Sequence, residues 1–408
     1  MELAVLSSLR AAPLLPNLQA VEYWSPFSAY LDRPDEILKC FAAPSLRSLD
    51  MSLDTRGGQE FSSALTDVFT HCGSLRTFHL RTRIGDVDLP LLSSALGHCA
   101  SLQHFSLRLD SHPSHRASPR LLAQLAALPK LCDLRLYTWI PHAHQGHTTP
   151  ATSPKPVVFS YLSSFELLTY DVASAVAILE RCTFPCLKKI ILFSECAAVH
   201  TLPSLLKSQI CAETLESLSI HAGSRSPTER LYARDPVVHY SELFPLLAFR
   251  NLENVSIVVT NRHGLHFDDE GWEAFAHAWP HLRTLRMTGA AVIETKSGCV
   301  ASTYKSFAHL ARLCPDIRSV DIIIADTDAP ESVSRDRGIP DLLPINRHVT
   351  KLHFHHSQLN DPDFTAAWVA KMFPSVSRTS RTTGSAKLQA HSIKVSFPEE
   401  RAVASIAW

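Results

Sequence analysis

The sequence lacks an excess of charge of either sign, and it lacks any long apolar run. Lys and Arg number 39, as do Asp and Glu, so the formal net charge is zero. No overall field therefore attracts nucleic acid or an anionic membrane surface. No apolar run approaches the roughly 18 residues that a membrane-spanning helix needs. We accordingly expect neither nucleic acid nor a membrane among the partners.

The sequence also lacks the short motifs that accompany common enzyme chemistry. It contains no GxSxG, GxxxxGK, GxGxxG or HExxH pattern. The closest cysteine pair, Cys182 and Cys186, has no second pair at zinc-finger spacing. The histidine-rich stretch 142–147 has no acidic or cysteine residue to complete a metal site. We expect no catalytic residues, no metal and no cofactor, and hence no enzyme.

The first ten residues, MELAVLSSLR, give no indication of secretion. Glu2 stands where a signal peptide carries positive charge, and no small-residue cleavage site follows clearly. Hydrophobic residues make up 45% of the chain and charged residues 19%, a balance typical of an ordered protein. We expect a cytoplasmic or nuclear protein.

What the sequence does contain is a repeat, and its 408 residues are too many for one compact core. The stretch PDIRSVDI at 315–322 has the form apolar-x-x-apolar-x-apolar, and eleven other stretches share it. Their lead residues recur at a mean spacing of about 30 residues, the long end of the leucine-rich repeat range. The twelve lead residues are Leu18, Leu46, Leu75, Leu102, Leu131, Leu162, Leu187, Leu215, Leu252, Leu282, Ile317 and Val349.

Between these stretches the apolar spacing becomes helical, most clearly at 61–72, 118–128, 172–182 and 269–279. A strand followed by a helix, repeated, builds a parallel sheet with helices on one face. The predicted fold is an α/β leucine-rich repeat solenoid (horseshoe) of about twelve irregular repeats, with the sheet on the concave face and helices on the convex face. We place it at residues 1–376, and a C-terminal polar linker and terminal segment at 377–408.

A Cys-Pro dipeptide precedes the strand in the repeat at 315–322. The position three residues before the lead residue holds Cys72, Cys99 and Cys314, and in other repeats Leu, Phe or Trp. A position that accepts these types interchangeably is an inward-facing helix end, where Cys packs as a small hydrophobe. The Pro that follows, such as Pro315, ends the helix and favours extended backbone.

The stretch CPDIRSVDI, with a helix in each repeat, resembles the leucine-rich repeat region of F-box proteins, especially fungal ones. The resemblance covers residues 15 to 376. The Asn expected eight residues after the lead is absent, so we expect an irregular solenoid. Only 17 residues precede Leu18, too few for an F-box within this chain. The early copies hold Asp54, Arg83, Asp110, Trp139 and Tyr170 at the Asn position.

The resemblance implies a protein-interaction scaffold, in particular the substrate-recognition part of an F-box-type ubiquitin ligase subunit. Contact with the ligase adaptor would then require an F-box upstream of this sequence. The alternative is a freestanding leucine-rich repeat inhibitor or scaffold unconnected with ubiquitin. Both hypotheses place a protein substrate or ligand on the concave face.

Alternation along a strand identifies the residues of that face. If the lead, +3 and +5 residues point into the core, then the +2, +4 and +6 residues point outward. Outward positions on neighbouring strands hold Arg and Tyr, which are enriched at protein interfaces, followed by two large apolar residues. The predicted partner-binding residues are His79, Arg81, Arg108, Arg135, Tyr137, Leu168 and Phe193.

Overall fold

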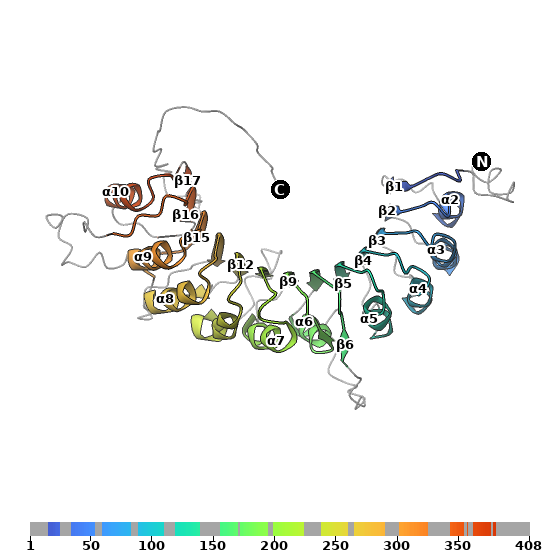
Figure 1. Ribbon diagram of the computed structural model, residues 1–408, viewed down its shortest axis with the longest axis horizontal. Helices are drawn as coiled ribbons and strands as arrows, with labels where there is room; N and C mark the ends of the chain where they lie inside the picture. Colours follow the sequence, from blue (N-terminus) through green and yellow to red (C-terminus); the bar gives the residue numbers. More distant parts are fainter. Residues whose placement is uncertain are drawn as a thin grey trace. The chain divides into compact units, whose positions relative to one another are not determined.

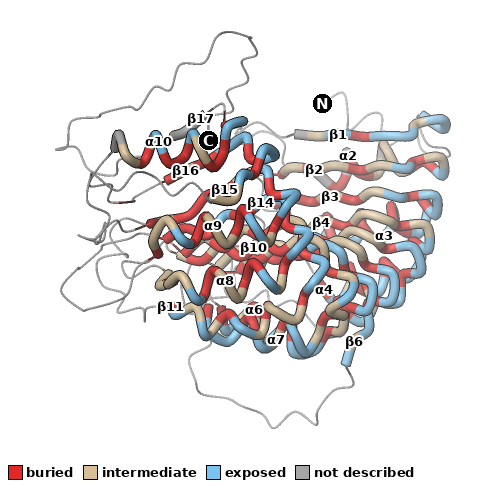
Figure 2. Tube along the Cα trace, turned by 60° about the vertical axis from the view of Figure 1, so that its left-hand side comes forward, coloured by how far each residue is buried: buried red, intermediate tan, exposed pale blue. Residues whose placement is uncertain are grey.

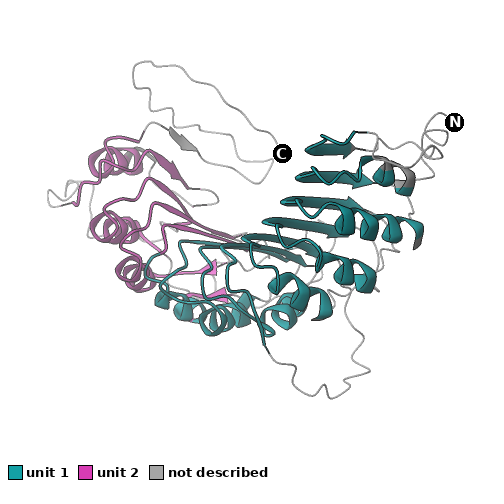
Figure 3. Ribbon diagram, turned by 45° about the vertical axis from the view of Figure 1, so that its right-hand side comes forward, with its two compact units in different colours: residues 1–235, 242–251 teal, residues 236–241, 252–408 magenta. Residues whose placement is uncertain are grey.

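The computed structural model divides into two compact units, residues 1–235 with 242–251 and residues 236–241 with 252–408 (Figure 3). The structure describes residues 15–24, 34–53, 59–82, 89–109, 119–138, 156–169, 172–194, 199–223, 238–259, 265–289, 302–324, 343–354, 357, 362–376 and 378–380.

The first unit is built from strands that alternate with helices, as the repeat predicts (Figure 1). Its parallel sheet has the strand order β1-β2-β3-β4-β5-β7-β9-β10, and the helices cover one face of it. The strands are β1 (Ala20–Trp24), β2 (Ser48–Leu53), β3 (Thr77–Thr82), β4 (His104–Leu109), β5 (Asp133–Thr138), β6 (Val157–Val158), β7 (Ser164–Thr169), β8 (Cys182–Thr183), β9 (Lys189–Ser194) and β10 (Ser217–Ala222). The helices are α2 (Pro34–Phe41), α3 (Gln59–His71), α4 (Leu89–Leu96), α5 (Pro119–Ala126), α6 (Val172–Leu179), η1 (Val199–Thr201) and α7 (Leu202–Gln209).

The second unit repeats the same arrangement with the strand order β12-β14-β15-β16-β17. Its strands are β11 (Val238–His239), β12 (Asn254–Val259), β13 (Leu265–His266), β14 (Thr284–Gly289), β15 (Ser319–Ile322), β16 (Lys351–His353) and β17 (Arg378–Ser380). Its helices are α8 (Asp269–Ala278), α9 (Tyr304–Leu313) and α10 (Pro362–Met372). The 3-10 helix η3 (Tyr240–Ala248) has its first two residues in the second unit and the others in the first. The α/β leucine-rich repeat solenoid predicted from the sequence is confirmed.

The core follows the repeat register. All lead residues except Leu18 are buried, and strands such as β2 and β4 alternate half-buried and buried residues. The buried parts of the chain lie between the sheet and its helices (Figure 2). The helices predicted at 61–72, 118–128, 172–182 and 269–279 are α3, α5, α6 and α8. Apolar periodicity therefore predicted both the elements and the faces that they bury.

The cysteines at the helix ends pack as predicted. Cys72, Cys99 and Cys314 are fully buried, and the seven cysteines whose side chains the structure describes are free thiols. Burial raises the pKa of Cys72 to about 11 and the pKa values of Cys99 and Cys314 to about 12. Two of these thiols also donate to backbone carbonyls, Cys99 Sγ to Phe69 O at 3.6 Å and Cys314 Sγ to Trp279 O at 3.4 Å.

Backbone hydrogen bonds connect the turn before each strand to the equivalent turn of the next repeat. The carbonyl oxygen of Arg47 accepts from the amides of Arg76 and Thr77, at 2.8 and 3.0 Å, and the same two-donor pattern recurs in both units. Side chains add bonds at these turns, as Ser163 Oγ does to Cys132 O at 3.0 Å. The five positions that replace the expected Asn lie outside the described residues.

Three features go beyond what the repeat pattern predicts. β17 pairs with β16 inside the segment expected to be a polar linker, and its sequence RTS has no apolar alternation to reveal it. Two short parallel pairs, β6 with β8 and β11 with β13, are too brief to carry a period. Within the described ranges, no helix is both long and apolar enough to cross a membrane.

Candidate partner-binding surface

The seven residues predicted to bind a partner lie on five adjacent strands of the first unit. We call the outward face of this sheet, opposite its helices, the sheet face. The strand register aligns the +6 residues in one row, Arg81, Arg108, Tyr137, Leu168 and Phe193, on β3, β4, β5, β7 and β9. The backbones of neighbouring members of this row are therefore about 4.8 Å apart across the sheet, which is the spacing between adjacent strands.

The +4 residues form a second row on the sheet face, two residues nearer the start of each strand. His79 aligns with Ser106, Ser106 with Arg135, and Arg135 with Glu166. His79 and Arg135 are thus separated by one strand rather than adjacent. The structure brings all seven predicted residues onto one face, in two parallel rows.

Arg108 is supported by an aromatic ring. Its guanidinium Cζ lies 5.7 Å from the ring centroid of Tyr137 on the next strand, within cation–π range. Tyr137 is itself fixed, because its hydroxyl donates to Glu166 Oε1 at 2.7 Å. Partial burial and this bond to a carboxylate raise the pKa of Tyr137 to about 12, so the hydroxyl stays protonated. The hydrogen bond to Glu166 therefore holds the Tyr137 ring in place against the Arg108 guanidinium.

Arg135 is engaged by two carboxylates of its own surface. Its Nη2 lies 3.2 Å from Asp133 Oδ2, and its Nε lies 3.7 Å from Glu166 Oε2. The hydrogen bond to Asp133 is the main cause that raises the pKa of Arg135 above its usual value. Because these carboxylates balance its charge, Arg135 holds the surface together more than it attracts an anionic partner.

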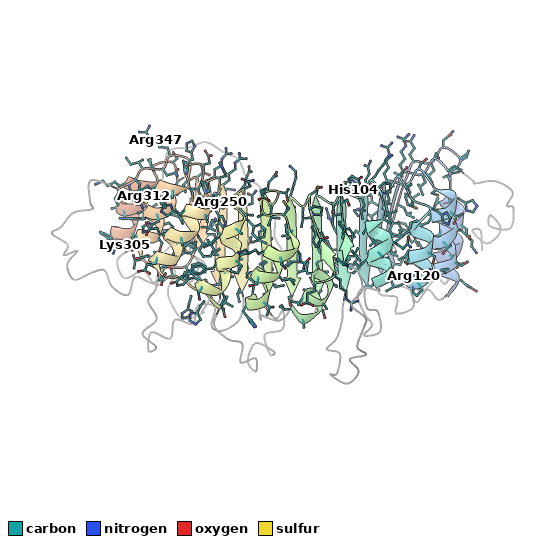
Figure 4. All side chains as sticks on the ribbon, turned by 60° about the horizontal axis from the view of Figure 1, so that its bottom comes forward. His104, Arg120, Arg250, Lys305, Arg312 and Arg347 are labelled. Carbon is teal, nitrogen blue, oxygen red and sulfur yellow. The ribbon has the colours of Figure 1, made fainter. Side chains whose placement is uncertain are left out.

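Two histidines and two carboxylates lie beside this network. His79 Nδ1 is 3.8 Å from Asp50 Oδ2, and His104 Nδ1 is 3.8 Å from Asp133 Oδ2 (His104 is labelled in Figure 4). Partial burial lowers the pKa of His79, and the nearby Arg135 and His104 act in the same direction, whereas Asp50 and Asp133 oppose them. The charged part of the surface therefore contains cations and anions in similar numbers.

The far end of the +6 row is apolar. Leu168 and Phe193 are half-buried neighbours on β7 and β9. The ring of Phe193 stacks on His221 of β10 at a centroid distance of 4.8 Å, and His221 Nε2 is 2.8 Å from Ser219 Oγ. Ile191 lies in the adjacent +4 row. Apolar surface thus adjoins the Arg pair across the ring of Tyr137.

The sequence prediction omitted Asp133 and His104, which are essential to the geometry. Both stand at +2 positions, which alternation places on the same face as the +4 and +6 residues. Strand alternation alone was therefore enough to predict that Asp133 and His104 lie on the sheet face. Their pairing depends on the register between β4 and β5, which the sequence does not state.

Among the described residues, no group of three or more His, Cys, Asp or Glu side chains could hold a metal ion. The histidine-rich stretch 142–147 lies outside the described residues. The described part of the sheet face offers hydrogen-bond donors, acceptors and apolar surface, which is the chemistry of a binding surface.

Comparisons with known proteins give similarity of structure but not of sequence. No protein-family model matches the chain, and no curated protein matches its sequence. A chain of the crystal structure of the Rad7 and Elc1 complex in yeast aligns with it at 14% identity and a TM-score of 0.41. The alignment covers 85% of this chain and 78% of that chain. This similarity carries no information about what the present chain binds.

Proposed function

We propose that this chain is a protein-binding scaffold whose sheet face in the first unit recognises an anionic group next to an apolar side chain. The observation that carries the proposal is the pair Arg81 and Arg108, aligned on adjacent strands, with Arg108 lying over the ring of Tyr137. Under this proposal the chain binds its partner and performs no chemistry on it.

The Arg pair favours a carboxylate or phosphate over other groups. A guanidinium presents its N–H donors in a planar fork that matches two anion oxygens. Tyr137 holds one such fork in place, so less conformational entropy is lost when an anion binds. Side chains such as Ser would satisfy the fold at these outward positions, so two aligned Arg residues on neighbouring strands favour a binding role.

The apolar half of the surface sets the second requirement. Leu168 and Phe193 follow Tyr137 in the same row, so an apolar side chain of the partner would lie two or three strands from an anionic group bound at Arg108. At strand spacings of about 4.8 Å, the two features of the partner would be about 10–15 Å apart. We expect the partner to be a protein segment that presents both.

The binding test replaces both arginines with serine in the full chain. A partner captured from cell extract by the parent chain is purified and titrated against the parent and against Arg81→Ser/Arg108→Ser. We expect the double variant to lose about 2 kcal/mol of binding free energy, roughly 30-fold in affinity. Its thermal unfolding should match that of the parent, because both side chains lie on the outward face.

The matched control removes two positive charges elsewhere on the same unit. Lys130 and Lys207 are exposed in a turn and on α7. Lys130→Ser/Lys207→Ser should bind as the parent does. Equal affinity of the Arg81→Ser/Arg108→Ser variant and the parent would show that the sheet face is not the binding site.

We further propose that the bound protein is a substrate of an F-box-type ubiquitin ligase, with this chain as the recognition part. This step rests on the resemblance of the repeat at 314–322 to F-box leucine-rich repeats. The test is affinity capture with this chain alone and with the coding region found upstream of it in the genome. Recovery of the ligase adaptor only with the upstream region would support this role. Its absence in both captures would favour a freestanding scaffold.

A further inference from the structure

The second unit has a separate cluster of exposed cations, at the edge of the sheet where the strands begin. We call Arg318, Arg347, His348 and Lys351, together with Ile345, the basic edge. All five side chains are exposed, and that of Ile345 is 60% exposed, more than most large apolar residues of the described chain. Figure 4 labels Arg347, which projects from this end of the unit. No residue of the basic edge belongs to the sheet face of the first unit.

A buried asparagine holds the basic edge in place. The side-chain amide of Asn346 donates to the carbonyl oxygens of Ala311, Cys314 and Pro315, at 3.4, 3.3 and 3.3 Å. Its side-chain oxygen accepts from the backbone amide of His348 at 2.9 Å. These bonds fasten the turn to the C-terminal end of α9 and satisfy carbonyls that the helix leaves open.

The anchoring of Asn346 also determines where its neighbours point. The backbone amide of Asn346 donates to Met372 O at 2.9 Å, which ties the same turn to α10. With Asn346 buried and bonded on both sides, Ile345 and Arg347 are left exposed on either side of it. The turn is therefore preorganised, and a partner would not have to order it on binding.

The backbone also places two cations of the basic edge next to each other. The amide of Lys351 donates to Arg318 O at 3.2 Å, which places the first residue of β16 beside the residue that precedes β15. The corresponding positions of the first unit hold Ser163 and Ser164 in one repeat and Lys188 and Lys189 in the next, so the fold accepts cations there but does not require them.

Other arginines of this unit have carboxylate partners, and the basic edge differs from them. Arg283 Nη1 is 3.1 Å from Glu253 Oε2, and Arg286 Nε is 3.2 Å from Asp321 Oδ2. Arg312, labelled with Arg347 in Figure 4, lies 3.3 Å from Glu273 Oε1.

By contrast, no carboxylate of the described residues forms an ion pair with the cations of the basic edge, Arg318, Arg347 and Lys351. Asp316, in the turn before β15, is the nearest acidic residue in sequence. Within the described ranges, the basic edge therefore carries a positive charge that no carboxylate neutralises in an ion pair.

We infer that the basic edge binds an acidic segment of a protein partner, with an apolar side chain of that segment against Ile345. Three formal cations are fewer than the 6–10 phosphate contacts typical of a strong DNA-binding site. They are also fewer than the 4–8 clustered Lys and Arg residues that hold anionic lipid surfaces. A short acidic peptide needs only two or three charge-assisted hydrogen bonds and one apolar contact, which this surface provides.

The test uses the full chain carrying Arg81→Ser and Arg108→Ser, so that the sheet face does not contribute. The probe is a fluorescent 12-residue peptide of Asp, Glu and Gly with one central Leu, titrated by fluorescence anisotropy at low salt. Adding Arg318→Glu and Lys351→Glu should raise its Kd at least about tenfold, since opposite charges are replaced by like charges. The matched control, Lys130→Glu with Lys207→Glu, should leave the Kd unchanged.

A second pair of measurements tests the apolar contact. Ile345→Ser should weaken binding of the Leu peptide several-fold and leave binding of a peptide with Ser in place of Leu unaffected. Circular dichroism confirms that each variant is folded, and Arg318→Ser/Lys351→Ser replaces the charge reversal if that variant unfolds.

Two outcomes would overturn the inference. One is a charge-reversal variant that binds the peptide as tightly as the Lys130→Glu/Lys207→Glu control. The other is tighter binding, through Arg318 and Lys351, to phosphatidylserine vesicles or to a 20-base-pair duplex than to the peptide. Because the sheet face is disabled throughout, failure here leaves the proposed function of the first unit standing.

Discussion

Replacing a buried cysteine should make the stability of this protein less sensitive to alkaline pH. Cys99 is fully buried, and burial raises the pKa of its thiol from 9.0 to about 12. In the unfolded chain the thiol ionises near pH 9, whereas in the folded protein it stays neutral up to about pH 12. The unfolded state therefore binds fewer protons in this window, and stability is lost as pH rises through it.

The size of the effect follows from these two pKa values. Well below pH 9 the Cys99 thiol is neutral in both states, so its ionisation takes nothing from the free energy of unfolding. At pH 10 about ten of eleven unfolded thiols are ionised and almost no folded ones, which lowers the free energy of unfolding by about 1.4 kcal/mol. That loss is a substantial fraction of the 5–15 kcal/mol that stabilises a typical domain. Cys182 and Cys314, whose thiol pKa values burial also raises to about 12, should behave alike.

The assay compares urea unfolding at pH 8 and pH 10 for the parent and for Cys99→Ala. At pH 8 the variant should be less stable than the parent, because a buried sulfur is removed. The difference between the two pH values should shrink by about 1.4 kcal/mol, since only the parent has the buried thiol to ionise. Cys186→Ala is the control, because the side chain of Cys186 is exposed in the folded protein.

A Cys99→Ala variant whose stability falls between pH 8 and pH 10 as much as that of the parent would refute the reasoning. It would mean that the thiol does not distinguish the folded from the unfolded state. The assignment of this helix-end position to the core would then lose its energetic support.

The remaining predictions concern the sheet face, the core and the anchored turn. Tyr137→Phe should cost about 1 kcal/mol of stability, because the hydrogen bond to Glu166 is lost. The variant should keep its partner affinity, since the ring still lies beneath Arg108. Equal losses of binding in titrations of Tyr137→Phe and Tyr137→Ser would argue against support by the ring. Leu285→Asp should abolish the cooperative thermal transition of its unit, since it places an unpaired carboxylate at a fully buried position; a transition within a few degrees of the parent would contradict this. Asn346→Ala should cost about 2 kcal/mol in urea unfolding by leaving three carbonyls unbonded, and an unchanged midpoint would show that water replaces the amide.

The sequence by itself determined the repeat, its strands and helices, and most of the core. These features depend on the spacing of apolar residues a few positions apart, as in 314–322, and such spacing is visible along the chain. The burial of Cys99 and Cys314 could be predicted for the same reason, because equivalent positions in other repeats hold large apolar residues. The outward orientation of Arg81 and Arg108 followed from strand alternation alone.

Only the tertiary structure decided which of the outward residues act together. The pairing of Arg135 and of Tyr137 with Glu166 depends on the lateral register of strands joined through long intervening segments. The role of Asn346 likewise depends on carbonyls more than thirty residues earlier in the chain. Apolar periodicity is a local property that the residues carry with them, whereas hydrogen bonds and ion pairs between repeats exist only once the register is set.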